Sequence, residues 1–289
     1  MNKNKLEALL SLLDDPDKEI HKRIKKELIE LPVSTIPQLE DSWLESKSPL
    51  FQERLEMVIN KIQFNNVKSE LINWSSDEKP NLIEGAILIN KSCNPNLLTD
   101  PIRKTILKIK HDVELEISDN LTPLEKIKIL NHFFYNIYNY QALSPNQPTN
   151  WDGDIGTVLS QKHGNYIILA IIYAGIAQEL DIPVYGINLP GSVLLCYIDE
   201  SPAKSKKKKK KNSDSILFYI NPIDKGAVFG MKDLQHIISA KKIENKDQFY
   251  KLASNTSMIK RLVQHEINVY KKLNLTSYIP NFKDLFRSL

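Results

Sequence analysis

The chain is poor in glycine and cysteine and has no long hydrophobic run. Nine glycines among 289 residues argue against a loop-rich barrel or sandwich and favour substantial helix. The longest uncharged apolar run, Tyr166–Ala177, is far shorter than the ~20 residues that span a bilayer, and the first residues lack the apolar core of a signal peptide. The two cysteines, Cys93 and Cys196, lie far apart without metal-ligand spacing, so we expect reduced thiols in a cytoplasmic protein.

Motifs for nucleotide or metal chemistry are also missing. The sequence contains no Gly-rich phosphate loop, no H-E-x-x-H pair and no CxxC. It therefore predicts neither a cofactor nor a metal. The remaining composition, 42% hydrophobic and 26% charged, is that of an ordinary globular protein.

The positive charge is concentrated in one insert. Seven lysines fall within Lys204–Lys211, and subtracting them from the net charge of +4 leaves about −3 for the rest of the chain. The segment 200–215 is predicted to be a disordered Lys-rich loop, because like charges repel and apolar residues are nearly absent. Lys206–Lys211 could bind anions weakly and non-specifically. The alternative is an insert without function.

The N-terminal part is predicted to be helical throughout. The phrase LLDDPDKEIHKRIKKELIEL followed by TIPQLEDSWLES resembles one HEAT-like helical pair, although a repeat array needs at least three such units. The alternative is a helical cap on the following domain. We therefore expect a HEAT-like cap over 1–65, a second domain over 66–275 and a tail over 276–289.

The second domain changes from helical to extended patterning. Its predicted helices are 67–74, 82–90, 99–115, 123–139, 155–160, 165–180, 231–239 and 248–273. Three short β-rich runs follow the helix 165–180, at 184–188, 193–198 and 216–220. The expected fold class is α+β, with a helical N-terminal portion and then a central helix packed on a small antiparallel sheet.

Four phrases of the chain resemble the SirB-type transglutaminase-like family. They are EGAILI (84–89), DGDIGTVLSQKHGN (152–165), LAIIYAGIAQELDIPVYGINLPG (169–191) and YINPIDKG (219–226). The order of the pieces is the most specific feature, and the resemblance covers about 80–275. It implies a transglutaminase-like (papain-like) domain, in which a nucleophilic cysteine begins the central helix, a histidine follows a P-G turn and an aspartate ends a later strand.

Carried over by position, this resemblance implies a changed triad. Tyr166 stands at the cysteine position, Ser192 at the histidine position and Asn221 at the aspartate position. A phenol with a pKa near ~10 is protonated at neutral pH, and a serine is no base there. The resemblance thus implies a pseudoenzyme, a non-catalytic protein-binding or regulatory module with an unidentified protein partner.

A relocated thiol is the alternative. Cys196 lies four residues after Ser192 and, on an unbroken strand, would face the same side. His163, just before the central helix, could approach that helix entry. With these residues the protein would be a cysteine-dependent hydrolase or acyl transferase. Without a catalytic role, Cys196 would be a buried structural cysteine and His163 a loop histidine.

Overall fold

The structure is a computed structural model that describes residues 3–143, 149, 151–187, 189, 193–199, 215–240 and 251–289. The chain divides into two compact units, one made of 1–70 and 91–96 and the other of 71–90 and 97–289. Ser192 and the Lys-rich segment 200–214 lie outside the described residues. Among the helices that are described, none is long and apolar enough to cross a bilayer.

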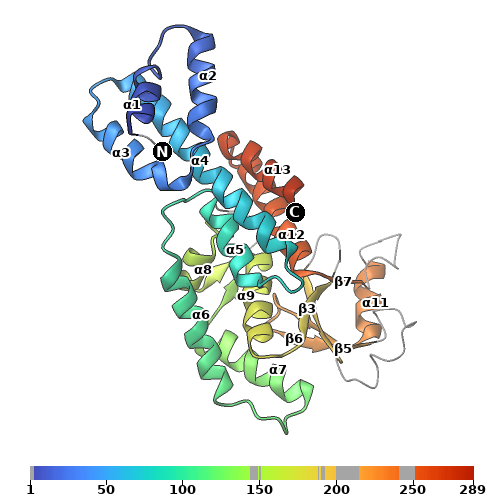
Figure 1. Ribbon diagram of the computed structural model, residues 1–289. Helices are drawn as coiled ribbons and strands as arrows, with labels where there is room; N and C mark the ends of the chain where they lie inside the picture. Colours follow the sequence, from blue (N-terminus) through green and yellow to red (C-terminus); the bar gives the residue numbers. More distant parts are fainter. Residues whose placement is uncertain are drawn as a thin grey trace. The chain divides into compact units, whose positions relative to one another are not determined.

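The first unit is built from helices around a leucine-rich core (Figure 1). Its elements are α1 (Lys3–Ser11), α2 (Lys18–Ile29), η1 (Val33–Thr35), α3 (Ile36–Glu45) and the first part of α4 (Pro49–Ser76). Asp17 caps α2 by accepting a hydrogen bond from the backbone N–H of Glu19 at 2.8 Å. The fully buried side chains Leu13, Leu28 and Leu39 fill the space between the helices.

Helix α4 corrects the sequence prediction of two helices here, one from Pro49 to about Ile62 and a separate one over 67–74. The structure has one continuous helix from Pro49 to Ser76. The connecting residues contain neither glycine nor proline, and Phe64 is buried. Asn66 donates its side-chain amide to Glu70 Oε1 at 2.6 Å instead of competing with the helical backbone.

The second unit combines helices with two small sheets. Its helices are α5 (Leu82–Lys91), α6 (Thr99–Glu114), α7 (Pro123–Asn131), η2 (His132–Ile137), α8 (Ile155–Gln161), α9 (Tyr166–Glu179), α11 (Met231–Ala240), α12 (Asn255–Lys272), η5 (Thr276–Tyr278) and α13 (Ile279–Ser288). Its strands are β1 (Gln141–Ala142), β2 (His163–Gly164), β3 (Val184–Ile187), β4 (Leu194–Ile198), β5 (Ile216–Asn221), β6 (Ala227–Phe229) and β7 (Leu252–Ala253).

The larger sheet is antiparallel, with strand order β6-β5-β4-β3-β7, and it confirms the predicted small antiparallel sheet. Strands β1 and β2 form a separate parallel pair. Helix α9 packs against β3 and β4 (Figure 1), while α11 contributes Leu234 and Ile238 to a buried cluster with Cys196 and Tyr219. Every α9 residue from Ile167 to Ala177 is buried, so α9 is the central helix.

Two further differences arise from contacts between distant segments. The predicted helix 123–139 is α-helical only to Asn131 and continues as the π-helical η2, a wider turn in which Phe134 and Tyr135 are both buried. The predicted helix 248–273 begins only at Asn255, because β7 before it pairs with β3 through Ala253 opposite Gly186.

The C-terminal segment 276–289 contains regular structure. It forms η5 and α13, and α13 packs on α12. The ring centroids of Tyr270 and Phe282 lie 5.1 Å apart, and the Lys260 ammonium lies over the Phe286 ring, 4.7 Å from its centroid. The segment predicted as a tail is thus part of the second unit.

Candidate functional site

The start of α9 is held by Asn165. Its side-chain Oδ1 accepts hydrogen bonds from the backbone N–H groups of Ile167 and Ile168, each at 2.9 Å. Because α9 begins inside the protein, water does not satisfy these first N–H groups, and a capping side chain must do so. The positive end of the helix dipole is directed at this region.

Tyr166 is the first residue of α9 and is half-buried. Its ring meets the ring of His265 in a T-shaped arrangement, with centroids 5.9 Å apart. Arg261, one turn earlier on α12, donates to the carbonyl oxygens of Ile187 at 2.9 Å and Leu189 at 2.8 Å. Burial lowers the pKa of Arg261, and the Tyr166 phenol partly offsets this effect. Tyr166 thus lies among side chains of α12.

Asp152, His265 and Glu266 converge beside this helix start. One potential ligand atom from each residue lies within 4.8 Å of the other two, and the His265 Nε2 to Asp152 Oδ1 distance is 3.8 Å. Asn165 donates its side-chain amide to Asp152 Oδ1 at 3.2 Å, and the backbone N–H of Thr149 donates to Asp152 Oδ2 at 3.1 Å. The residue that caps α9 therefore also orients Asp152.

The two carboxyl groups of this cluster differ in acidity. Burial, together with the nearby Asp152 and Asp154, raises the pKa of Glu266 to about 8. Burial also opposes ionisation of Asp152, but His265 and the hydrogen bonds from Thr149 and Asn165 outweigh it and lower the pKa of that carboxyl. Asp152 is therefore the ionised acid of the pair at neutral pH.

The structure does not describe all three positions of the expected triad. Ser192 lies outside the described residues. Asn221 ends β5, and its Oδ1 accepts from the Ile223 N–H at 3.1 Å, so its side chain closes its own turn. Tyr166 contacts His265, a residue of α12. The sequence prediction for the triad as a whole stays a prediction.

The two residues of the alternative thiol site lie in different sheets. Cys196 is fully buried in β4, and burial raises the pKa of its thiol to about 12. His163 lies in β2 opposite Gln141, and its Nδ1 is 2.8 Å from the Gln161 carbonyl oxygen. In the described part of the chain, the structure gives no contact between Cys196 and His163.

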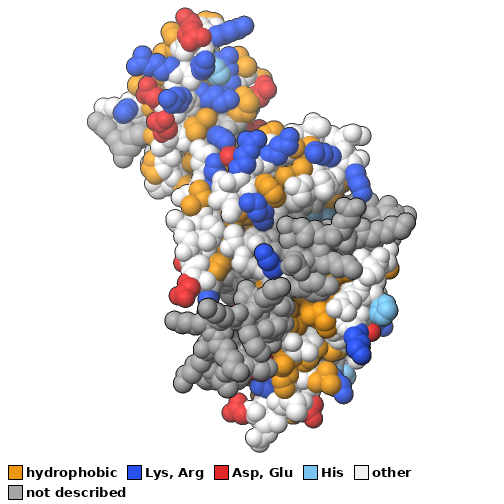
Figure 2. Space-filling view, turned by 90° about the vertical axis from the view of Figure 1, so that its right-hand side faces the viewer, with side chains coloured by type: hydrophobic (Ala, Val, Ile, Leu, Met, Phe, Trp, Pro, Cys, Tyr) orange, Lys and Arg blue, Asp and Glu red, His pale blue; other side chains and the backbone are white. Residues whose placement is uncertain are grey.

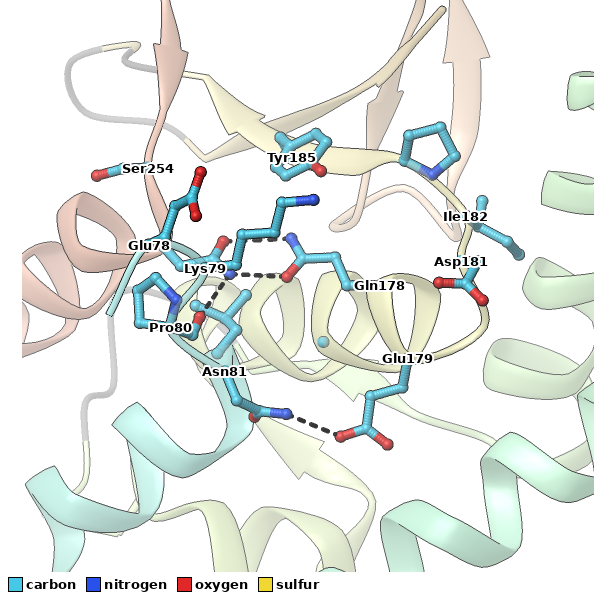
Figure 3. Close-up of a pocket in the computed structure, with 14 residues that line it drawn as sticks. Glu78, Lys79, Pro80, Asn81, Gln178, Glu179, Asp181, Ile182, Tyr185 and Ser254 are labelled. Atoms are coloured by element: carbon cyan, nitrogen blue, oxygen red, sulfur yellow. Dashed lines mark hydrogen bonds between the residues drawn. The ribbon is translucent and has the colours of Figure 1, made fainter. Parts of the chain in front are cut away.

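A pocket of about 500 Å³ lies at the other end of α9 (Figure 3). Gln178 and Asn255 exchange side-chain amide hydrogen bonds in its wall at 3.2 and 2.7 Å, and Asn81 donates to Glu179 at 3.0 Å. Helix α9 has 14 residues, so this pocket is roughly 20 Å from Tyr166 along the helix axis. It is separate from the cluster at the helix start.

Sequence reasoning missed Asp152, His265 and Glu266. One signal was available for Glu266: it occupies the buried face of α12, which also carries Ile259, Leu262, Val263 and Tyr270. A carboxylate on the apolar face of an amphipathic helix is rare unless it has a partner or a function. No local pattern marks Asp152 as the partner of residues more than a hundred positions later.

Comparison with known proteins agrees with this architecture. A family model described as Transglutaminase-like superfamily matches residues 100–264, which is more than half of the chain. No curated protein and no solved structure matches the chain significantly. The match includes Asp152, Asn165 and the whole of α9, and it ends one residue before His265. The chain therefore belongs to the transglutaminase-like superfamily.

Proposed function

We propose that this chain is a non-catalytic transglutaminase-like protein that acts as a protein-binding or regulatory module. One observation carries the proposal: Tyr166 is the first residue of α9, directly after the N-cap Asn165. This is the place at which the resemblance implies a nucleophilic thiol. A thiol there would gain acidity from the helix start, whereas a phenol remains protonated near neutral pH.

The competing thiol mechanism has weak physical support. A cysteine attacks as a thiolate, which requires a lowered pKa and access to substrate. Cys196 has 0% exposure, and burial raises the pKa of its thiol to about 12. Its neighbours in the buried cluster are apolar side chains such as Ile187 and Leu234. This environment favours a structural cysteine.

A thiol-directed probe tests the non-catalytic proposal. Native protein carrying Cys93→Ser is incubated with an iodoacetamide probe at pH 7.5, so that Cys196 is its only cysteine. We expect labelling to be slow in the native protein and fast after denaturation. The matched control is the reverse variant, Cys196→Ser, in which the half-buried Cys93 remains. Labelling of Cys196 that is faster in the native protein than in the denatured protein would overturn the proposal.

The first unit offers a surface for a protein partner. Helix α2 carries the basic residues Lys18, Lys22, Arg23, Lys25 and Lys26. Figure 2 shows many Lys and Arg side chains on the part of the molecule that this unit forms. Lys22 and Lys26 are exposed and four residues apart, so they share one face of α2. We infer that an acidic protein surface is the complementary partner.

Charge reversal on α2 tests this surface. Cross-linking and quantitative affinity capture from cell extract are compared between the wild-type protein and the double variant Lys22→Glu/Lys26→Glu. The control, Lys104→Glu/Lys108→Glu, reverses two exposed charges on α6. We expect a salt-sensitive partner to be lost from the α2 variant alone. Equal capture by all three proteins would contradict docking through α2.

Two finer assignments rest on the sequence. We infer a SirB-type member from the order of the phrases around 84–89, 152–165, 169–191 and 219–226, and we interpret α2 with α3 as one HEAT-like pair.

We also propose a cytoplasmic location, because Cys93 and Cys196 are thiols and not a disulfide. Any anion binding by Lys206–Lys211 would add to docking through α2.

A further inference from the structure

Two buried polar atoms at the start of α9 have no hydrogen-bond partner. They are Oε1 of Glu266 and Nε2 of His265, both on α12. Glu266 has only 5% exposure, so its side chain is shielded from bulk solvent. A buried polar atom left in this way is unfavourable, and more so when it is charged. A bound ligand would supply the missing partner to both atoms.

Both residues lie beside Asp152. One ligand atom each of Asp152, His265 and Glu266 lies within 4.8 Å of the other two, and His265 Nε2 is 3.8 Å from Asp152 Oδ1. This distance is too long for a hydrogen bond. Ligands placed 2.0–2.2 Å from a common metal lie about 3–4.4 Å from one another, so small side-chain shifts would bring all three to one centre.

Neighbouring residues leave room for the Glu266 carboxylate and orient that of Asp152. A Cβ atom at Gly153 would collide with Glu266 Oε1, so a larger residue there would displace that carboxylate. Asp152 is oriented by hydrogen bonds from Asn165 and from the backbone of Thr149. Outer hydrogen bonds of this kind fix the direction of metal-binding carboxylates. The orienting residue Asn165 also caps α9, which makes the site part of the helix start.

The donor set indicates the class of ion. Two carboxylates and one imidazole nitrogen are oxygen and nitrogen donors, without sulfur. Imidazole suits Zn²⁺ and other first-row transition ions, whereas Mg²⁺ and Ca²⁺ favour sites made of oxygen alone. A divalent cation would also compensate the charge of both acids and so allow Glu266 to ionise beside the buried Asp152 carboxylate.

We propose that Asp152, His265 and Glu266 bind one divalent first-row transition-metal ion, Zn²⁺ or Mn²⁺, beside the start of α9. This site is independent of the proposed non-catalytic function, because it stands on the orphaned atoms and not on the identity of residue 166. Bound metal would join the loop that carries Asp152 to α12 and so stabilise the second unit.

Metal titration of the full chain tests the proposal. Protein treated with EDTA and then dialysed is titrated calorimetrically with Zn²⁺, with Mn²⁺ and with Mg²⁺, and its melting temperature is followed. We expect one Zn²⁺ or Mn²⁺ per chain, a raised melting temperature and no comparable effect of Mg²⁺. Absence of micromolar binding by both Zn²⁺ and Mn²⁺ would overturn the site.

Variants locate the bound ion. Glu266→Gln keeps the side-chain shape, and we expect it to weaken binding by at least roughly tenfold. His265→Asn should do the same, while His236→Ala, at an exposed histidine of α11, should bind normally. Undiminished binding by Glu266→Gln and His265→Asn would place the ion elsewhere and contradict the proposal. Since Glu266→Gln removes a buried acid, it should fold without metal, and its melting temperature should no longer respond to Zn²⁺.

Discussion

The rings of Tyr166 and His265 meet at 82° with their centroids 5.9 Å apart. A histidine from α12 therefore stands beside the residue at which the family resemblance implies a nucleophile. Asp152 lies 3.8 Å from the same imidazole. The start of α9 thus keeps a histidine and a carboxylate close to residue 166, although the family match ends before His265.

The thiol of Cys196 should respond to alkaline pH in a characteristic way. Its folded pKa of about 12 lies above the ordinary 9.0, so the folded state keeps the proton longer than the unfolded state. The stability that this thiol contributes is therefore complete below pH 9 and decreases as the pH rises toward 12. By pH 11 we expect a loss of about 1–3 kcal/mol.

Urea unfolding of the Cys93→Ser protein between pH 8 and 11 measures this loss, with Cys93→Ser/Cys196→Ala as the reference that lacks the thiol. The difference in unfolding free energy between the two should shrink as the pH rises. A difference that stays constant to pH 11 would show that Cys196 titrates normally.

Replacement of Asn165 should weaken the start of α9. Asn165→Ala removes the cap on the N–H groups of Ile167 and Ile168 and one hydrogen bond to Asp152. We expect a loss of about 1–3 kcal/mol in unfolding free energy. Asn165→Ser keeps a capping oxygen and should lose less. Equal losses in the two variants, measured by urea denaturation, would contradict the capping role.

A methyl group at position 153 should collide with Glu266. In Gly153→Ala the new Cβ would lie 1.9 Å from Glu266 Oε1, and we expect about 1–3 kcal/mol of destabilisation. The double variant Gly153→Ala/Glu266→Ala should recover part of this loss, because the clash disappears. Gly156→Ala is the control: its nearest atoms are 3.4 Å away and it lies in α8, so its thermal stability should not fall.

Asn131 should be needed to hold the turn after β5. Its Nδ2 donates to the Gly226 carbonyl at 2.8 Å, and its Oδ1 accepts from the buried Tyr173 hydroxyl at 2.7 Å. Asn131→Ala leaves both groups unsatisfied, and we expect a loss of about 2–4 kcal/mol in chemical denaturation. The control Asn136→Ala changes an exposed amide and should cost less than about 0.5 kcal/mol. Similar losses for both variants would contradict this role.

The sequence by itself determined most of the local structure. The apolar run in α9, the Thr122-Pro123 helix start and the β-rich runs that form β3 to β5 are properties of short segments, and the structure confirms them. The Thr122 capping box is present as the spacing of Thr122 and Glu125 predicts. Such patterns can be read because period, caps and turns depend on neighbours within a few residues.

Tertiary structure decided the rest. It joined the two predicted helices into α4, inserted β7 ahead of α12, and brought Asp152 together with His265 and Glu266. The physical reason is that these outcomes depend on contacts between segments far apart in the chain. Glu266 is a conspicuous acid on the apolar face of its helix. Only the fold brings the Asp152 carboxylate close to it and places Gly153, which has no side chain, against its carboxylate.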